Sequence, residues 1–216
     1  MNISPFAQKT KFKKERIRMR KSLLLSTALV SVFAAAQANA FEVKDGETIN
    51  LNTIFKDGIV NENIWSIDQE KGGTASLTTD TIKISSDIEN PIIYADYSKS
   101  KIQLGAKNTE DLKILANKGL GVVVYDGANT ELTAKKINIT AENNAVFMWD
   151  KDSVLNMNAD DVSISSTCTD AIILGTSSVA NIKAKNVAKP DTICAICAQS
   201  FKCTPFNTSA ILIIIL

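Results

Sequence analysis

The chain has 216 residues, a mass of 23.4 kDa and a nearly balanced charge, with 24 basic against 23 acidic residues. That length suits one domain or two small ones. No histidine is present, which excludes a Ser-His-Asp triad, a Cys-His dyad, a histidine-ligated metal and histidine acid–base catalysis.

The balanced charge hides a sharp division near residue 40. Residues 1–40 hold five lysines and three arginines against one glutamate, a net charge of +7. Residues 41–216 hold 16 lysines, 22 acidic residues and no arginine, a net charge of −6. Without arginine the body lacks the bidentate guanidinium clamp for phosphates and carboxylates. Its acidic balance argues against nucleic-acid binding.

The first forty residues have the three parts of a secretory signal peptide. The basic run 9–21 precedes a fourteen-residue apolar stretch, 23–36, and small residues at Ala38 and Ala40 end the segment. We expect export through the Sec translocon and cleavage after Ala40. Because the basic run is long, the signal is either an extended one or begins at Met19.

The alternative for this segment is a retained membrane anchor. Residues 22–40 carry no charge, and their nineteen positions just suffice to cross a bilayer. The last third of the stretch is Ala, Gln and Asn, which enter lipid less favourably than Leu or Ile. We therefore favour a cleaved signal and a mature chain without a stable transmembrane span. The expected location is the periplasm, the cell surface or the medium.

The residues after the signal repeat with a period of about 25. The motif that begins Ala134-Lys-Lys-Ile recurs at Ala159 and Ala184, and the same interval leads back to Thr109. A looser copy begins at Thr79, at a slightly longer interval before Thr109. Further equivalences pair Val154 with Val179, Asn156 with Asn181, Met157 with Ile182, and Phe147 with both Ile172 and Val122. Self-similarity at a fixed interval is the signature of a solenoid.

Within each unit apolar and polar residues alternate with a period of two, which is typical of strands with one buried face. One unit is predicted to hold strands near 134–140, 145–149 and 153–158. An antiparallel sandwich also uses short alternating strands, but it gives no reason for a constant offset. We therefore expect an all-β fold, a right-handed parallel β-helix with about 25 residues per coil.

The signal peptide, together with coils such as residues 153–164, resembles the passenger region of bacterial autotransporters, the type V secretion family. The resemblance spans roughly residues 19–188 and rests on pattern and composition. It implies a surface-displayed rod, commonly an adhesin, which a C-terminal β-barrel carries across the outer membrane. The stretch after Ala188 is much shorter than such a barrel needs. We therefore expect a passenger fragment truncated before the translocator, from a parent associated with the outer membrane.

Four segments are expected along the chain. Residues 1–40 are the signal peptide, 41–75 an N-terminal cap, 76–188 the β-helix coils and 189–216 a divergent tail. A cap is expected because the first coil of a solenoid must cover an open edge and an apolar cross-section.

The tail changes composition abruptly. Cys194, Cys197 and Cys203 lie close together, and the chain ends in the apolar run 210–216. The Cys-x-x-Cys spacing is compatible with a metal or redox site, and an exported location permits a disulfide. We favour a third interpretation, in which the frame of the repeat is lost and the tail was not selected to fold.

Candidate chemistry in the body is sparse. Carboxylates such as Asp160 and Asp161 could bind Ca²⁺ or activate water if a β-helix stacked them. Lys135 and Lys136 occupy the same register one coil away, which favours charge pairs between coils on a solvated face. We therefore predict no catalytic, cofactor-binding or metal-binding residue.

Four aromatic residues carry weaker signals. Tyr94 and Tyr97 are candidates for a carbohydrate-stacking pair, although packing of an irregular coil is the plainer interpretation. Trp149 alternates with Phe147, which predicts a core or groove aromatic.

Three functions are compatible with these features. The first is a secreted or surface-displayed adhesin or interaction rod without catalysis, whose partner is a glycan or protein of a host or sister cell. The second is a β-helix polysaccharide lyase or hydrolase. The third is a non-functional remnant of an interrupted autotransporter gene. The first is favoured, because the body is acidic and rich in outward-facing polar residues.

Overall fold

The computed structural model describes residues 40–43, 46–67, 69–150, 152–175 and 177–188, and the backbone of two further strands, Ile193–Ala195 and Ile211–Ile215. The chain divides into two units, Met1–Asn39 and Ala40–Leu216. The first unit lies outside the described residues, and the predicted signal peptide lies there with it except for Ala40. The second unit is considered by itself below.

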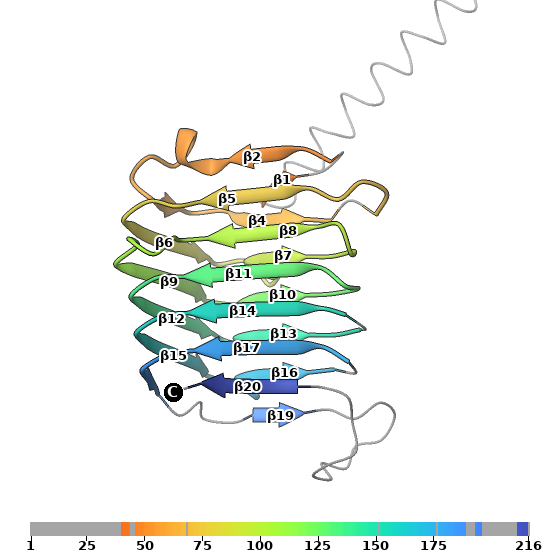
Figure 1. Ribbon diagram of the computed structural model, residues 1–216, viewed down its shortest axis with the longest axis vertical. Coiled ribbons are helices and arrows are strands. Elements are labelled where there is room, and N and C mark those ends of the chain that lie inside the picture. Colours follow the sequence, from red (N-terminus) through yellow and green to blue (C-terminus); the bar gives the residue numbers. More distant parts are fainter. Residues whose placement is uncertain are drawn as a thin grey trace, which may run out of the picture. The chain divides into compact units, whose positions relative to one another are not determined.

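The second unit is an all-β parallel solenoid of about six turns with about 25 residues per turn, as expected from the repeat (Figure 1). Neighbouring strands in each of its three sheets are parallel. Sheet A contains β1 (Ala40–Val43), β4 (Asn63–Ser66), β7 (Ile93–Ala95), β10 (Val122–Val124), β13 (Val146–Met148), β16 (Ile172–Leu174) and β19 (Ile193–Ala195).

Sheets B and C complete each turn. Sheet B contains β2 (Thr48–Asn50), β5 (Thr74–Leu77), β8 (Lys101–Leu104), β11 (Asn129–Thr133), β14 (Val154–Asn158), β17 (Val179–Lys183) and β20 (Ile211–Ile215). Sheet C contains β3 (Ile59–Val60), β6 (Thr81–Ser86), β9 (Asp111–Ala116), β12 (Lys136–Ala141), β15 (Asp161–Ser166) and β18 (Asn186–Val187). The strands predicted near 134–140, 145–149 and 153–158 correspond to β12, β13 and β14.

Sheet C follows the predicted interval. Asp111 pairs with Lys136, Lys136 with Asp161, and Asp161 with Asn186, so three successive steps are equal and match the repeat. The looser copy is also confirmed, because Thr81 pairs with Asp111 across the longer interval. In sheet B the predicted pairs Val154–Val179, Asn156–Asn181 and Met157–Ile182 are all present.

Sheet A departs from the constant interval, and one predicted equivalence is wrong by one position. Phe147 pairs with Val123 and Ile173, not with Val122 and Ile172. The reason lies in two corners of different length. The corner between β12 and β13 is one position shorter than the corner between β15 and β16, and the corner after β13 is one position longer in compensation. The two differences cancel, so the turn keeps its length while its strand in sheet A, β13, is displaced by one residue relative to the repeat.

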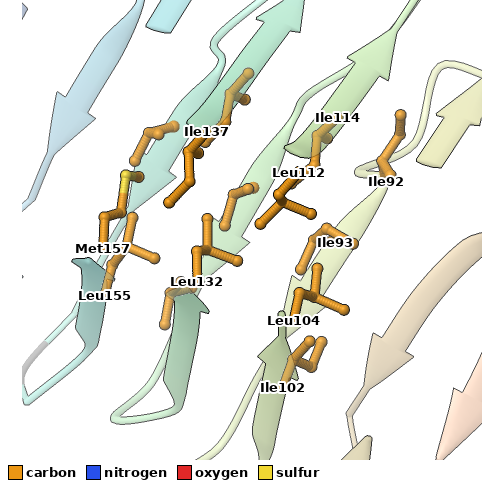
Figure 2. Packing of buried hydrophobic residues seen from close by; sticks show 14 of the residues in the cluster. Ile92, Ile93, Ile102, Leu104, Leu112, Ile114, Leu132, Ile137, Leu155 and Met157 are labelled. Carbon is orange, nitrogen blue, oxygen red and sulfur yellow. The ribbon is translucent and has the colours of Figure 1, made fainter. Parts of the chain in front are cut away.

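The interior is filled by every second side chain of each strand. On β12, for example, Ile137 and Ile139 are fully buried, whereas Lys136, the first residue of the strand, is exposed. In Figure 2 the labelled side chains of β7, β8, β9, β11, β12 and β14 converge on one continuous apolar interior. Full burial of one Leu or Ile side chain stabilises a fold by about 1.5–3 kcal/mol. Stacked apolar columns therefore hold the turns together.

Residues 41–75 contribute strands to all three sheets. They include nearly all of β1, the whole of β2, β3 and β4, and the start of β5. A 3₁₀ helix, Leu51–Thr53, follows β2 and buries Leu51. Ile54 and Ile59 are 51% and 48% exposed at this end of the solenoid. The backbone register of the later turns therefore extends into the segment predicted as a cap.

Two short segments of the tail also join the sheets. The backbone of β19 pairs with β16, and that of β20 pairs with β17. Cys194 lies on β19, whereas Cys197 and Cys203 fall outside the described residues, as does any disulfide or metal site that they would form. Cys168 is a free, exposed thiol. No helix among the described residues is long and apolar enough to cross a membrane.

Candidate functional site: an aromatic face on sheet A

The outward-facing side chains of sheet A differ in kind from those of sheets B and C. At the central strand position, successive turns of sheet A carry Trp65, Tyr94, Val123, Phe147 and Ile173. The equivalent column of sheet B carries Ser76, Gln103, Glu131, Asn156 and Asn181. That of sheet C carries Lys83, Lys113, Asn138 and Ser163. From β4 to β16 this column of sheet A is thus apolar, whereas the exposed Glu42 occupies the same position on β1.

Two further rings extend this surface. Tyr125 and Trp149 follow β10 and β13, and their backbone N–H groups continue the ladder to Ala95 and Val124. We call the aromatic face the set Trp65, Tyr94, Val123, Tyr125, Phe147, Trp149 and Ile173. It holds five of the eight aromatic side chains in the described part of the chain. All five rings are partly exposed, whereas the smaller Val123 side chain is covered. Large exposed apolar patches commonly mark interaction sites.

Specific contacts orient these rings. Trp65 and Tyr94 meet edge to face, with centroids 6.3 Å apart and an angle of 87°. Phe147 and Trp149 are stacked, with centroids 6.0 Å apart and an angle of 8°. The Trp65 indole N–H donates a hydrogen bond of 2.8 Å to the Pro91 carbonyl. Rings held in this way lose little conformational entropy on binding a ligand.

Trp149 also depends on a glycine in the next turn. A β-carbon at Gly175 would lie 2.7 Å from Cε3 of Trp149. Real β-carbons do not approach so closely, so any larger residue at this position would displace the indole. The local sequence therefore leaves space for Trp149 to lie flat over the backbone.

A column of carboxylates borders the aromatic face at the corner between sheets A and B. We call Asp96, Asp126 and Asp150 the carboxylate column. Asp126 and Asp150 occupy equivalent positions in successive turns, whereas Asp96 lies one position earlier in its turn, in register with Tyr125 and Trp149. Asp96 is 8% exposed. Its carboxylate accepts hydrogen bonds of 2.8 Å from the Tyr94 hydroxyl and from the Tyr97 backbone N–H. Asp150 accepts a hydrogen bond from the Tyr125 hydroxyl.

The titration of these groups reflects their surroundings. Burial raises the pKa of Asp96, hydrogen bonds from Tyr94 and Tyr97 oppose the rise, and the charges of Asp126 and Asp150 add to it. Burial and the Asp96 carboxylate hold the pKa of Tyr94 well above its usual range. Burial and the hydrogen bond to Asp150 raise the pKa of Tyr125. The phenols therefore remain protonated hydrogen-bond donors at neutral pH.

The same corner contains unusual backbone conformations. Tyr97, Asp126 and Asp150 have positive φ angles of 70°, 44° and 69°. Asp adopts this left-handed region readily, whereas a bulky residue such as Tyr does so at a cost of about 1–3 kcal/mol. The strain at Tyr97 is thus stored beside the aromatic face.

Charged residues at the opposite corner, between sheets B and C, are paired. Lys135 contacts Glu110 of the preceding turn at 2.5 Å, and Lys185 contacts Asp160 at 3.0 Å. The predicted charge pairing between turns is confirmed, although Lys135 engages Glu110 rather than Asp160. Exposed pairs of this kind stabilise a fold only slightly. We call the alternating series Glu110, Lys135, Asp160 and Lys185 the ion-pair ladder.

A shallow groove runs beside this ladder, lined by Glu110, Asp111, Lys135, Lys136, Asp160 and Asp161. The groove brings lysine and carboxylate side chains together, the kinds of group that a polysaccharide lyase would need. The hydrogen bond to Glu110 raises the pKa of Lys135, which opposes a role for this amine as a general base. Among the described residues, no three His, Cys, Asp or Glu side chains converge as metal ligands.

The structure bears on both interpretations of the aromatic residues. Tyr94 packs edge to face against Trp65, which agrees with the plainer interpretation, packing of an irregular coil. Phe147 and Trp149 lie on the outer surface of sheet A rather than in the core, because Val146 and Met148 take the inward positions. Trp65 and Tyr125 were not predicted as surface residues. Each directly follows a buried residue, Ile64 or Val124, and this alternation is the sequence signal that places their side chains on the outer surface.

No protein family, curated protein or solved structure matches this chain. The fold and the surface therefore define the class directly: an all-β parallel solenoid with an apolar, aromatic outer face on one sheet.

Proposed function

We propose that this chain is a passenger-like interaction rod, exported or displayed at the cell surface, whose aromatic face binds a partner without catalysis. The single observation that carries the proposal is the gathering of five aromatic rings on the outer surface of sheet A. Tyr and Trp are the residues most enriched at the energetic centres of interfaces. Partly exposed rings on a rigid sheet suit recognition, because the surface needs no rearrangement to bind.

The features of residues 1–40 support export in this proposal, and the autotransporter resemblance supports display at a surface. The absence of histidine from the whole chain favours binding over acid–base chemistry. The proposed partner is a glycan or protein on a host or sister cell.

An adhesion assay tests the proposal. Beads coated with the purified full chain are incubated with sister cells and with surfaces of collagen, fibronectin and mucin. We expect the double variant Phe147→Ser and Trp149→Ser to reduce retention about tenfold, the effect of losing a hot-spot pair.

The matched control is the double variant Val154→Ser and Val179→Ser, which removes two partly exposed apolar residues from the outer face of sheet B. It should change retention less than about twofold, within the range of peripheral contacts. Equal losses from both double variants, or no retention of the unmodified chain on any surface, would contradict the proposal.

A further inference from the structure

The proposed function leaves the chemistry of the ligand open. We infer that the aromatic face and the adjoining carboxylate column bind an extended, lysine- or arginine-bearing segment of a partner protein. This inference rests on the proposed function, because it requires the aromatic face to be a binding surface.

The carboxylate column concentrates negative charge. The ion pairs among the described residues join Lys101 to Glu131, Lys135 to Glu110 and Lys185 to Asp160, so none engages Asp96, Asp126 or Asp150. Adjacent turns stack about 4.8 Å apart, and like charges directly opposite one another destabilise a sheet. The opposite corner shows that this fold can alternate its charges. A cationic ligand would offset the repulsion in the column.

Two aromatic rings lie beside the carboxylate column. Tyr125 directly precedes Asp126, and Trp149 directly precedes Asp150, so each of these carboxylates leaves the backbone next to an aromatic ring. A lysine or arginine side chain near an aromatic face gains cation–π attraction. Its charged head gains a charge-assisted hydrogen bond from a carboxylate. The two groups together are selective for a cation over a neutral or anionic ligand.

The length of the carboxylate column along the solenoid suits an extended peptide. Its carboxylates come from three stacked turns and span about 10 Å along the solenoid, with Asp96 offset by one residue along its turn. Alternate side chains of an extended peptide lie about 7 Å apart on one face. Two basic residues at alternate positions can therefore reach the column through their flexible stems, while the intervening residue faces away.

Tyr97 lies at the same corner. It holds an aromatic ring at the left-handed position where the next two turns carry Asp126 and Asp150. Strained backbone is retained mainly where function uses it. The Tyr97 N–H also fixes the Asp96 carboxylate, so that the first member of the column is oriented before a ligand arrives.

The experiment measures binding of a labelled peptide of alternating lysine and glycine to the purified full chain by fluorescence anisotropy. A peptide of alternating glutamate and glycine and the neutral glycan cellohexaose serve as comparison probes. We expect binding of the lysine peptide alone, weakening as salt is added.

The charge variant is Asp126→Asn with Asp150→Asn. Asn retains the shape of Asp and tolerates positive φ, so the corner should keep its fold. We expect about tenfold weaker binding of the lysine peptide, consistent with loss of two charge contacts. The matched control, Asp111→Asn with Asp161→Asn, makes the same change in net charge at the opposite corner and should alter binding less than about twofold.

The variant Trp149→Leu separates cation–π attraction from simple apolar contact. It keeps an apolar side chain over Gly175 but removes the aromatic face. We expect a several-fold loss of affinity for the lysine peptide. Unchanged affinity in this variant would overturn the aromatic part of the inference.

The remaining outcomes separate the inference from the proposed function. Equal effects of the two charge variants would show attraction to net charge only and overturn the inference. Binding of cellohexaose or the glutamate peptide in place of the lysine peptide would also overturn it, while the proposed function would stand. Absence of peptide binding, together with adhesion that is unchanged in the double variant Phe147→Ser and Trp149→Ser, would contradict both the inference and the proposed function.

Discussion

Thr130 places a hydroxyl in the apolar interior. It lies between Ile102 and Leu155 in one column of sheet B and is fully buried. Its Oγ1 has no hydrogen-bond partner. A buried polar group that loses its water without gaining a partner costs about 1–3 kcal/mol. The residue is therefore a local weakness within an otherwise regular column.

We expect Thr130→Val, which keeps the branched shape, to raise the free energy of unfolding by about 1 kcal/mol. Urea denaturation followed by circular dichroism measures the change. Thr140→Val is the control, because the Thr140 hydroxyl has a partner in Ser165 at 3.2 Å. Its effect should be neutral or destabilising. A loss of stability in Thr130→Val would show that the hydroxyl is satisfied in solution.

At the scale of the strand and its corner, close approach of neighbouring turns restricts the sequence most. Gly105 directly follows β8 with a φ of 79°, and a β-carbon there would lie 1.9 Å from the Thr133 carbonyl oxygen. Gly46 has a similar φ of 73°, but its nearest neighbour would be the Lys71 β-carbon at 3.3 Å. The two glycines share a backbone conformation and differ in the space beside them.

We expect Gly105→Ala to destabilise the fold by about 3 kcal/mol or more, because overpacking against backbone adds to the conformational strain. Gly46→Ala carries the strain alone and should cost about 1 kcal/mol. Thermal or urea unfolding of the two variants gives the comparison. Equal losses would mean that turn stacking at Gly105 is looser than the structure shows.

The same corners explain what the sequence could and could not predict. From Asp111 to Asn186 sheet C was predictable residue by residue, since each full turn keeps the same length even where its corners differ. Sheet A was not, because the short corner before β13 and the long corner after it cancel within one turn. The outward position of Phe147 was also hidden. In the run Val146 to Trp149 every residue is apolar, so alternation of polarity cannot indicate which side chains face the core.

At the scale of the whole solenoid unit, each turn contacts only the turns beside it, so stability is a sum of local terms. The ends are then the weakest parts. The N-terminal edge carries the exposed Ile54 and Ile59. The aromatic face begins one strand in from the edge strand β1 and lies along β4, β7, β10, β13 and β16 (Figure 1). The candidate binding surface therefore rests on turns that are supported from both sides.

Tryptophan fluorescence shows whether sheet A presents its rings to the outside. The chain has two tryptophans, and both Trp65 and Trp149 belong to the aromatic face. Acrylamide quenching of the folded full chain reports their accessibility, and the variant Trp65→Phe isolates the signal of Trp149. We predict clear quenching of both rings in the folded state, at a level between that of the urea-unfolded chain and that of a buried indole. Emission that acrylamide cannot quench until the chain unfolds would place the rings in the core and contradict the account.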